Sequence, residues 1–242
     1  MKNSSDTYLQ NGQTVAEIER LREQLSKDPT AVLSVCRNTE THDQRVGQFT
    51  KWMGERLSEI IRDLQQLEGS IRTCVEKLPA QSGFFVDAET RRRATLCISY
   101  FLSEAERTVG RLREMGLSLS HFEERLKQEK HRCFADERRC ELMLHAATEL
   151  KDVCDPAPCR EAFDSLKACG ERYGALLEKE RKAATLLRCF CQTTVVNFNA
   201  RVEKNADLAN GGERCEIRPM RAVLGELLYV CQGLQKNFSA LK

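Results

Sequence analysis

The stretch that decides the fold is residues 88–152, which read AETRRRATLCISYFLSEAERTVGRLREMGLSLSHFEERLKQEKHRCFADERRCELMLHAATELKD. It contains no proline, and its apolar residues recur at the spacing of one helix face. A single helix of this length extends ~98 Å at about 1.5 Å per residue. Because such a helix extends beyond any compact core, we expect an all-α fold in which equally long helices pack against it.

A second long helix precedes this stretch. Over residues 46–78, apolar residues alternate steps of three and four with one exception, a heptad pattern typical of left-handed coiled packing. Pro79 ends that helix because proline cannot continue it. Asp87 is then the N-cap that we expect for residues 88–152.

The third long helix comes after a reversal of the chain. Two prolines in residues 152–159 cannot continue a helix and predict a tight turn. A helix then returns over residues 158–209, and its apolar stripe shifts by one position near Val195, which predicts a bend or a change of partner. A final short helix begins near Pro219, a favourable residue for a first turn.

We divide the chain into residues 1–43 and 44–242. The first part is partly disordered over residues 1–12, holds a short helix that ends at Asp28-Pro29, and continues into a polar linker over residues 37–43. The second part is an elongated antiparallel coiled coil of three long helices. Within it, we expect Phe84-Phe85 to anchor the loop before the longest helix to the bundle.

Composition and motifs argue against an enzyme. Only 6% of the residues are aromatic and 31% are charged, whereas ligand pockets rely on apolar and aromatic side chains. The sequence contains no Rossmann, P-loop, zincin or nucleophile-elbow motif. Cys154 with Cys159, and Cys189 with Cys191, lack a second pair at zinc-finger spacing. We therefore expect no catalysis, no cofactor and no metal.

The net charge and the cysteines limit the partners and the cellular compartment that we expect for the chain. A formal net charge of +2 argues against general nucleic-acid binding. The chain has 12 cysteines but begins without an apolar signal segment, which favours free thiols over disulfides. Several of these cysteines take helix seam positions, where a thiol acts as a small apolar side chain. No apolar run approaches the ~18 residues of a membrane-spanning helix, so we expect a cytoplasmic protein.

Two series of basic residues run along the distal part of the long helix and its return. Arg125, Arg132 and Arg139 are spaced by heptads and form a line beside the apolar seam. Such a line suits an anionic bilayer, where each basic residue contributes about 1 kcal/mol near the surface. The lipid-binding residues that we expect are Arg125, Lys127, Lys130, Arg132, Arg138, Arg139, Arg160, Lys167, Arg172, Lys179, Arg181 and Lys182. The alternative is an intrahelical charge ladder, since Glu129 and Asp136 come four positions after Arg125 and Arg132.

The helix lengths also predict a homodimer. The first long helix extends only ~50 Å, so the distal part of residues 88–152 and its return form a hairpin arm with limited cover. A second chain or a curved surface would supply that cover. The dimer core that we expect comprises Phe49, Trp52, Leu57, Ile60, Leu64, Phe101, Leu112, Leu227, Leu234 and Phe238.

The order of these elements resembles that of BAR domains over residues 44–242. The resemblance includes the stretches Arg125-Leu126-Lys127 and Lys130-His131-Arg132-Cys133-Phe134-Ala135-Asp136, and Gln232 and Gln235 in the final helix. It implies a crescent-shaped antiparallel dimer whose concave basic face binds curved, negatively charged membranes. Asp152 and Asp155 stand at the reversal, where strongly membrane-bending members carry lysines. This difference favours curvature sensing over vigorous tubulation.

The sequence thus leads to two functional hypotheses. The first is a peripheral membrane protein that binds or senses membrane curvature as a dimer on anionic lipid. The second is a coiled-coil scaffold of the cytoskeleton or of the trafficking machinery, which binds a protein partner and not lipid.

Overall fold

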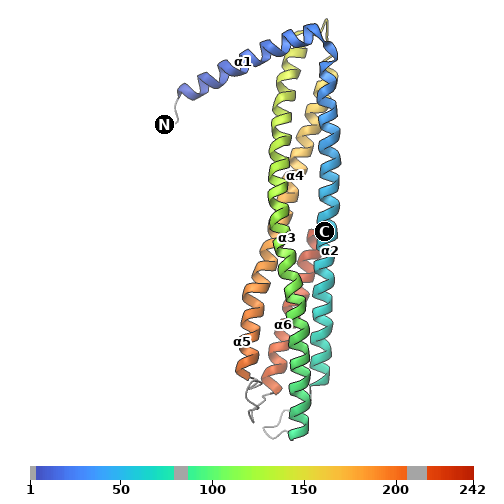
Figure 1. Cartoon of the computed structure of the whole chain (residues 1–242), viewed down its shortest axis with the longest axis vertical. Helices are drawn as coiled ribbons and strands as arrows, with labels where there is room; N and C mark the ends of the chain where they lie inside the picture. The colour runs from blue at the N-terminus through green and yellow to red at the C-terminus, as the bar shows by residue number, and fades with distance from the viewer. Residues whose placement is uncertain (1–3, 79–86, 206–216) are drawn as a thin grey trace. The chain divides into compact units, whose positions relative to one another are not determined.

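The computed structural model describes residues 4–78, 87–205 and 217–242, and every element in these ranges is a helix. This confirms the all-α prediction. The predicted loop with Phe84-Phe85 and the predicted end of the third long helix at residue 209 lie outside the described residues. None of the described helices combines the length and the apolar character needed to cross a bilayer. The elements, in chain order (Figure 1), are α1 (Ser4–Lys27), η1 (Pro29–Val32), α2 (Leu33–Lys77), α3 (Ala88–Glu149), α4 (Ala157–Cys189), η2 (Phe190–Thr194), α5 (Val195–Asn205) and α6 (Ile217–Leu241).

The longest helix begins where the sequence predicts. A carboxylate oxygen of Asp87 accepts the backbone N–H of Thr90 at 2.8 Å, which satisfies one of the amide groups left open in a first helical turn. The helix α3 ends at Glu149, three residues before the predicted end, and the chain then reverses into α4. There the side chain of Asp155 accepts the backbone N–H of Ala157 at 2.9 Å, so a second aspartate caps the returning helix.

The register shift predicted near Val195 corresponds to a π-helical segment, η2. Its backbone bond runs from the N–H of Val195 to the carbonyl of Phe190, one residue longer than the bond of an α-helix. The wide turn accommodates the extra residue. Phe190 and Cys191 within η2 and Phe198 after it are consequently all buried. The third long helix is therefore continuous in α4, η2 and α5 up to Asn205.

The N-terminal region differs from the prediction. Helix α1 begins at Ser4, so residues 4–12 are helical, and α2 begins at Leu33. Residues 37–43, which we predicted to be a linker, are therefore part of α2. The predicted end of the first helix at Asp28-Pro29 is confirmed: α1 ends at Lys27, and Asp28 caps η1 by accepting the backbone N–H of Thr30 at 3.0 Å.

The chain divides into two compact units. Unit 1 comprises Met1–Lys51 and Glu124–Glu178, and unit 2 comprises Trp52–Glu123 and Lys179–Lys242. Each unit therefore contains part of α2, α3 and α4. Unit 1 also contains α1 and η1, and unit 2 also contains η2, α5 and α6.

The core of unit 1 combines aliphatic side chains with thiols and one tyrosine. Tyr173 on α4 is fully buried and meets the ring of Phe49 edge-on, with 6.2 Å between the ring centres. Burial raises the pKa of its hydroxyl. Cys133 and Cys140 on α3 are equally buried, and the thiol of Cys133 donates to the carbonyl of Leu166 at 3.4 Å. Thiols thus take the seam positions that we predicted for them.

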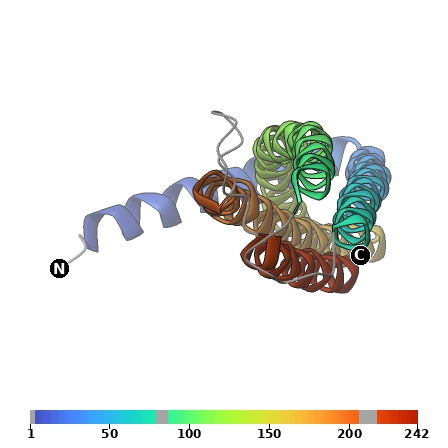
Figure 2. The ribbon, with the colours of Figure 1, turned by 90° about the horizontal axis from the view of Figure 1, so that it is seen from below.

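The core of unit 2 is built on the predicted heptad positions of α2. Leu57, Ile60 and Leu64 are each fully buried. On α3, Phe101 meets Phe198 of α5 edge-on at a ring distance of 5.9 Å, a favoured aromatic geometry. Figure 2, which looks along the helices, shows α6 next to both α2 and α5.

A polar cluster joins α6 to α2 in unit 2. The amides of Gln232 and Gln235 donate to the two carboxylate oxygens of Glu68 at 3.0 and 2.7 Å. Arg72 donates to the same carboxylate at 2.8 Å. The hydrogen bonds from Gln232, Arg72 and Gln235 lower the pKa of Glu68 to about 2, so this carboxylate is charged at neutral pH.

The expectation of a poorly covered hairpin arm is wrong for unit 1. The first turns of α2 pack along α3 there: His42 contacts Asp136 through Nε2 at 3.0 Å, and Asn38 donates to the same side chain at 3.3 Å. Because α2 begins at Leu33, its 45 residues extend ~68 Å, against the ~50 Å assumed from the sequence. The chain itself supplies cover that we had assigned to a second chain or a membrane.

Candidate functional site

A depression in unit 2 lies between α3 and the end of α4 with the following segment η2. It has a volume of ≈ 630 Å³, within the range of small-molecule and peptide sites. We call it the α3/α4 groove. Its lining residues are Leu112, Arg113, Gly116, Leu117, Ser120, Glu123, Arg181, Ala184, Thr185, Leu187, Arg188, Cys191 and Gln192.

The floor of the groove is apolar. Leu112, Leu187 and Cys191 are buried beneath it. Leu117 differs from them because it is 66% exposed although it is a large apolar side chain. Beside it, Gly116 has open space where a side chain would stand, with no atom within 4 Å of the position of a Cβ. The groove therefore offers apolar surface that nothing in the described chain covers.

The rim of the groove is basic. Arg181 and Glu123 form an ion pair at 2.9 Å at one end. Arg113 and Arg188 line the groove as well, and neither forms an ion pair with any residue that the structure describes. Burial raises the pKa of the Cys191 thiol, and the guanidinium of Arg113 partly opposes that shift.

The local sequence explains why the groove lies at this point. Segment η2 begins at Phe190 and adds one residue to the helix turn that carries Cys191 and Gln192. Segments of this kind occur often at functional sites, since they turn side chains away from the regular helix pattern. On the opposite wall, Gly116 removes the side chain that would otherwise fill the space.

The residues predicted to bind lipid separate into two groups. Those with a contact to the protein itself include Arg125 over the ring of Phe49, Arg132 paired with Glu129, and Arg181 paired with Glu123. The others of this group are Lys127, Arg172, Lys179 and Lys182. Those without an ion pair to any described residue are Lys130, Arg138, Arg139, Arg160 and Lys167, all exposed.

Two of the cations predicted to bind lipid lie toward different helices of unit 1. Arg125 lies against α2 through Phe49, at 5.6 Å from the ring centre. Lys130 instead lies toward α4, where its Nζ comes within 3.4 Å of the Cβ position of Gly174. These two side chains are thus directed toward different helices, α2 and α4.

The predicted charge ladder is also changed. Arg132 pairs with Glu129, three residues before it, at 2.6 Å. Asp136, which we expected to pair with Arg132, contacts His42 and Asn38 of α2 instead. Asp136 therefore joins α3 to α2, whereas the pair of Arg132 with Glu129 lies within α3.

The residues predicted for a dimer core are packed inside a single chain. Nine of the ten are buried without a second copy, namely Phe49, Leu57, Ile60, Leu64, Phe101, Leu112, Leu227, Leu234 and Phe238. The remaining one, Trp52, is half-buried and stacks on Phe122, with 3.9 Å between the ring centres.

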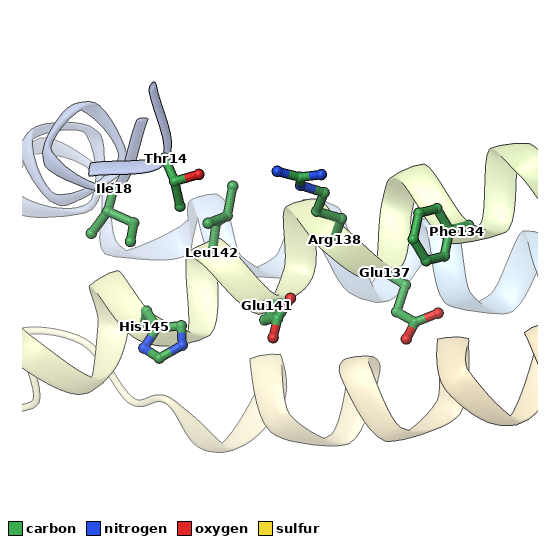
Figure 3. Close-up of a pocket in the computed structure, with 8 residues that line it drawn as sticks. All are labelled: Thr14, Ile18, Phe134, Glu137, Arg138, Glu141, Leu142 and His145. Carbon is green, nitrogen blue, oxygen red and sulfur yellow. The ribbon is translucent and has the colours of Figure 1, made fainter. Parts of the chain in front are cut away.

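A second, smaller cavity lies in unit 1 between α1 and α3, with a volume of ≈ 340 Å³. Figure 3 shows Thr14 and Ile18 of α1 near Leu142 of α3. The remaining lining residues are Phe134, Glu137, Arg138, Glu141 and His145. Because acidic and basic side chains alternate around this cavity, its charge favours no particular class of ligand.

Within the described ranges, no three His, Cys, Asp or Glu side chains are grouped as a metal site would require. Cys189 is exposed and Cys191 is buried, so the Cys189-Phe190-Cys191 sequence does not present both thiols at one surface.

Sequence reasoning missed most of the α3/α4 groove. Leu117 lies off the apolar stripe of its helix, next to a glycine, and that combination was the one signal available. Arg188 follows Arg181 and Lys182 on α4, but it is not among the residues that we predicted to bind lipid. Arg113 lies outside the predicted arm, so no sequence signal placed these two arginines at one site.

The described residues thus define an all-helical protein with an apolar groove under a basic rim. Comparison with protein-family models, with curated proteins and with solved structures gives no match.

Proposed function

We propose that the chain is a non-catalytic helical scaffold that binds an amphipathic helix of a partner protein in the α3/α4 groove. The observation that carries this proposal is the exposed apolar surface at Leu117 and Gly116, flanked by Arg113 and Arg188 without ion-pair partners among the described residues. Exposed apolar surface with a polar rim is characteristic of sites for protein partners.

The dimensions of the groove fit a helix. Its lining on α3 covers residues 112–123, a rise of ~18 Å or about three helical turns. Helix-in-groove recognition uses apolar anchors at i, i+3 or i+4 and i+7, which need two to three turns. The arginines on the rim favour acidic residues beside those anchors, because complementary charge promotes association and excludes wrong partners.

The experiment uses a synthetic acidic amphipathic helix as the ligand. A fluorescein-labelled peptide of about five turns carries Leu at i, i+3, i+4 and i+7 and Glu elsewhere, and its anisotropy is measured as the full chain is added. Gly116→Phe is the test variant, since Gly116 lines the groove and a Cβ at this position meets no atom within 4 Å. Gly110→Phe is the matched control, because Gly110 is an open glycine on α3 outside the groove.

We expect saturable binding that Gly116→Phe weakens at least tenfold and Gly110→Phe leaves within about twofold, since tenfold corresponds to about 1.4 kcal/mol. Arg113→Glu with Arg188→Glu should weaken the same peptide and should permit binding of its counterpart with Lys in place of Glu. Equal affinity for the acidic and the basic peptide, or binding that is insensitive to Gly116→Phe, would contradict the proposal.

The second candidate is the membrane hypothesis, in which a BAR-like homodimer contacts anionic lipid. The five exposed cations without ion pairs in unit 1 support it, because unpaired surface cations are attracted to anionic headgroups. The ion pairs of Arg132, Arg172 and Arg181 weigh against it, since those guanidiniums already have carboxylate partners.

Vesicle co-sedimentation separates the two candidates. Vesicles of phosphatidylcholine with and without phosphatidylserine are mixed with the chain at low and at physiological salt. The membrane hypothesis requires phosphatidylserine-dependent binding that falls as salt rises and is lost in Arg139→Glu with Lys167→Glu, while Gly116→Phe binds normally. Absence of vesicle binding at low salt would exclude the membrane hypothesis. It would not affect the conclusion drawn from peptide binding to the α3/α4 groove.

A further inference from the structure

Two cysteines of unit 2 are in direct contact across the α2–α3 pair. The Sγ atom of Cys97 on α3 lies 3.5 Å from the Sγ atom of Cys74 on α2. The Sγ atom of Cys97 also lies 3.7 Å from the backbone carbonyl oxygen of Cys74. The Sγ atom of Cys74 lies 3.9 Å from the carbonyl oxygen of Cys97. The two side chains therefore point at one another.

We propose that Cys74 and Cys97 form a reversible intramolecular disulfide when the chain meets a hydroperoxide. A disulfide requires an S–S distance of about 2.05 Å, so the two sulfur atoms have to approach by roughly 1.5 Å relative to their present contact. Rotation of two thiol-bearing side chains and a small adjustment of the helices accommodate a movement of that size.

The two thiols differ in access, which fixes the order of events. Cys74 is buried, whereas Cys97 is half-buried and is reached first by a small oxidant. Burial, together with the hydrogen bond to Cys97, raises the pKa of Cys74 to about 12. Cys74 is therefore a protonated thiol next to Cys97. It acts as the resolving thiol, which attacks the oxidised sulfur of Cys97.

The chemistry balances with hydrogen peroxide as the oxidant. The thiolate of Cys97 attacks one peroxide oxygen, the O–O bond breaks, and hydroxide leaves and takes up a proton to form water. The product is a sulfenic acid on Cys97. The sulfur of Cys74 then attacks Sγ of Cys97, the S–O bond breaks, and the departing hydroxide takes the proton of Cys74 to form a second water. Two electrons pass from the two sulfurs to the peroxide.

Other thiols of the chain provide internal comparisons. Cys140 and Cys159 in unit 1 also lie close together, with the thiol of Cys140 at 3.2 Å from the carbonyl of Cys159. Both are fully buried, so an oxidant has no direct access to either. Among the cysteines whose side chains the structure describes, Cys189 is the exposed one, so it is replaced by serine in the experiment to prevent links between chains through this thiol.

The experiment treats the reduced full chain, in the Cys189→Ser background, with an equimolar amount of hydrogen peroxide. Trypsin then releases residues 73–77 and 94–107, each of which contains one cysteine. We expect mass spectrometry to find these two peptides linked before any other pair, and dithiothreitol to release them. A linked 74–97 pair should raise the midpoint of thermal unfolding by roughly 5–15 °C, since it closes a loop across two helices.

Two single variants test the order of the steps. In Cys74→Ser, the sulfenic acid on Cys97 has no resolving thiol and should accumulate as a dimedone adduct. In Cys97→Ser, Cys74 should remain a free thiol under the same treatment. Failure of the 73–77 and 94–107 peptides to link, with Cys97 recovered as a free thiol or as a sulfinic acid, would overturn the proposal. So would a faster link between Cys140 and Cys159.

Discussion

Arg45 on α2 donates from Nη1 to the carboxylate of Glu129 on α3 at 2.6 Å. Arg132 donates to the other oxygen of the same carboxylate, also at 2.6 Å. Glu129 takes a seam position of α3, yet only 14% of its side chain is exposed. Two guanidiniums thus neutralise and cover an acidic residue where an apolar one would be expected, which makes the contact between α2 and α3 in unit 1 specific.

The Arg45–Glu129 pair should contribute a measurable but modest coupling. Because the side chain of Arg45 is 40% exposed, solvent screens the pair, and we expect a coupling free energy of about 0.5–1 kcal/mol. Urea unfolding of Arg45→Ala, Glu129→Ala and the double variant gives that value. Glu124→Ala, an exposed neighbour, should change stability by no more than about 0.5 kcal/mol. A coupling of zero would mean that Arg132 alone neutralises Glu129.

Acid should loosen the attachment of α6 to α2 in unit 2. The pKa of Glu68 is lowered from 4.5 to about 2 in the folded chain. A lowered pKa means that this carboxylate stabilises the fold above about pH 4.5 and that the stabilisation is lost as the pH falls toward about 2.

The matched variants for that test are Glu68→Gln and Glu55→Gln, both on α2. Glu68→Gln should be less stable than the parent at pH 7 and should lose less stability between pH 5 and pH 3, as measured by urea unfolding. Glu55 is exposed, and its replacement should leave the pH profile of the parent unchanged. Parallel profiles for Glu68→Gln and the parent would refute the role given to Glu68.

Local periodicity was sufficient to predict the start of α3 and the buried face of α2 in unit 2. The start of α3 after Asp87 and the burial of Leu57, Ile60 and Leu64 result from a cap and from a heptad repeat. Both signals depend on neighbours within a few residues. The register shift near Val195 was equally readable, because one extra residue displaces every later apolar position by the same angle.

Long-range pairing was not visible in the sequence. Residues 37–43 look like a polar linker until Asn38 and His42 are placed beside Asp136, which lies far away along the chain. In the same way, the basic line on α3 looks uniform until Arg132 pairs with Glu129 and Arg125 covers Phe49. Polarity alone does not tell a solvent-facing residue from one that joins two helices.

The hydroxyl of Tyr173 should matter less than its ring. The hydroxyl oxygen lies 3.5 Å from the carbonyl of His42, a long contact for a hydrogen bond. Tyr173→Phe should therefore cost less than about 1 kcal/mol. Tyr173→Ala should cost about 3–5 kcal/mol, because it leaves a cavity in a buried core. Chemical unfolding distinguishes the two. Equal costs would mean that the hydroxyl, not the packing of the ring, determines the stability of this site.

The packing of α5 should depend on the helix register that follows the π-helical segment η2. Gln192 lies within it and is exposed, so one alanine inserted after it adds a residue that the wide turn does not already contain. The insertion would rotate all later residues of the helix by about 100° about its axis, which would carry Phe198 and Val202 away from their buried positions. We expect a loss of at least about 3 kcal/mol, comparable to removal of a buried aromatic ring. Deletion of Gln192 instead converts the wide turn into a regular α-helical turn and keeps the later residues in their orientation, and Gln192→Ala should cost no more than about 0.5 kcal/mol. Thermal and urea unfolding should therefore find the insertion far more destabilising than the deletion. If insertion and substitution were equally mild, the packing of α5 would not depend on its register.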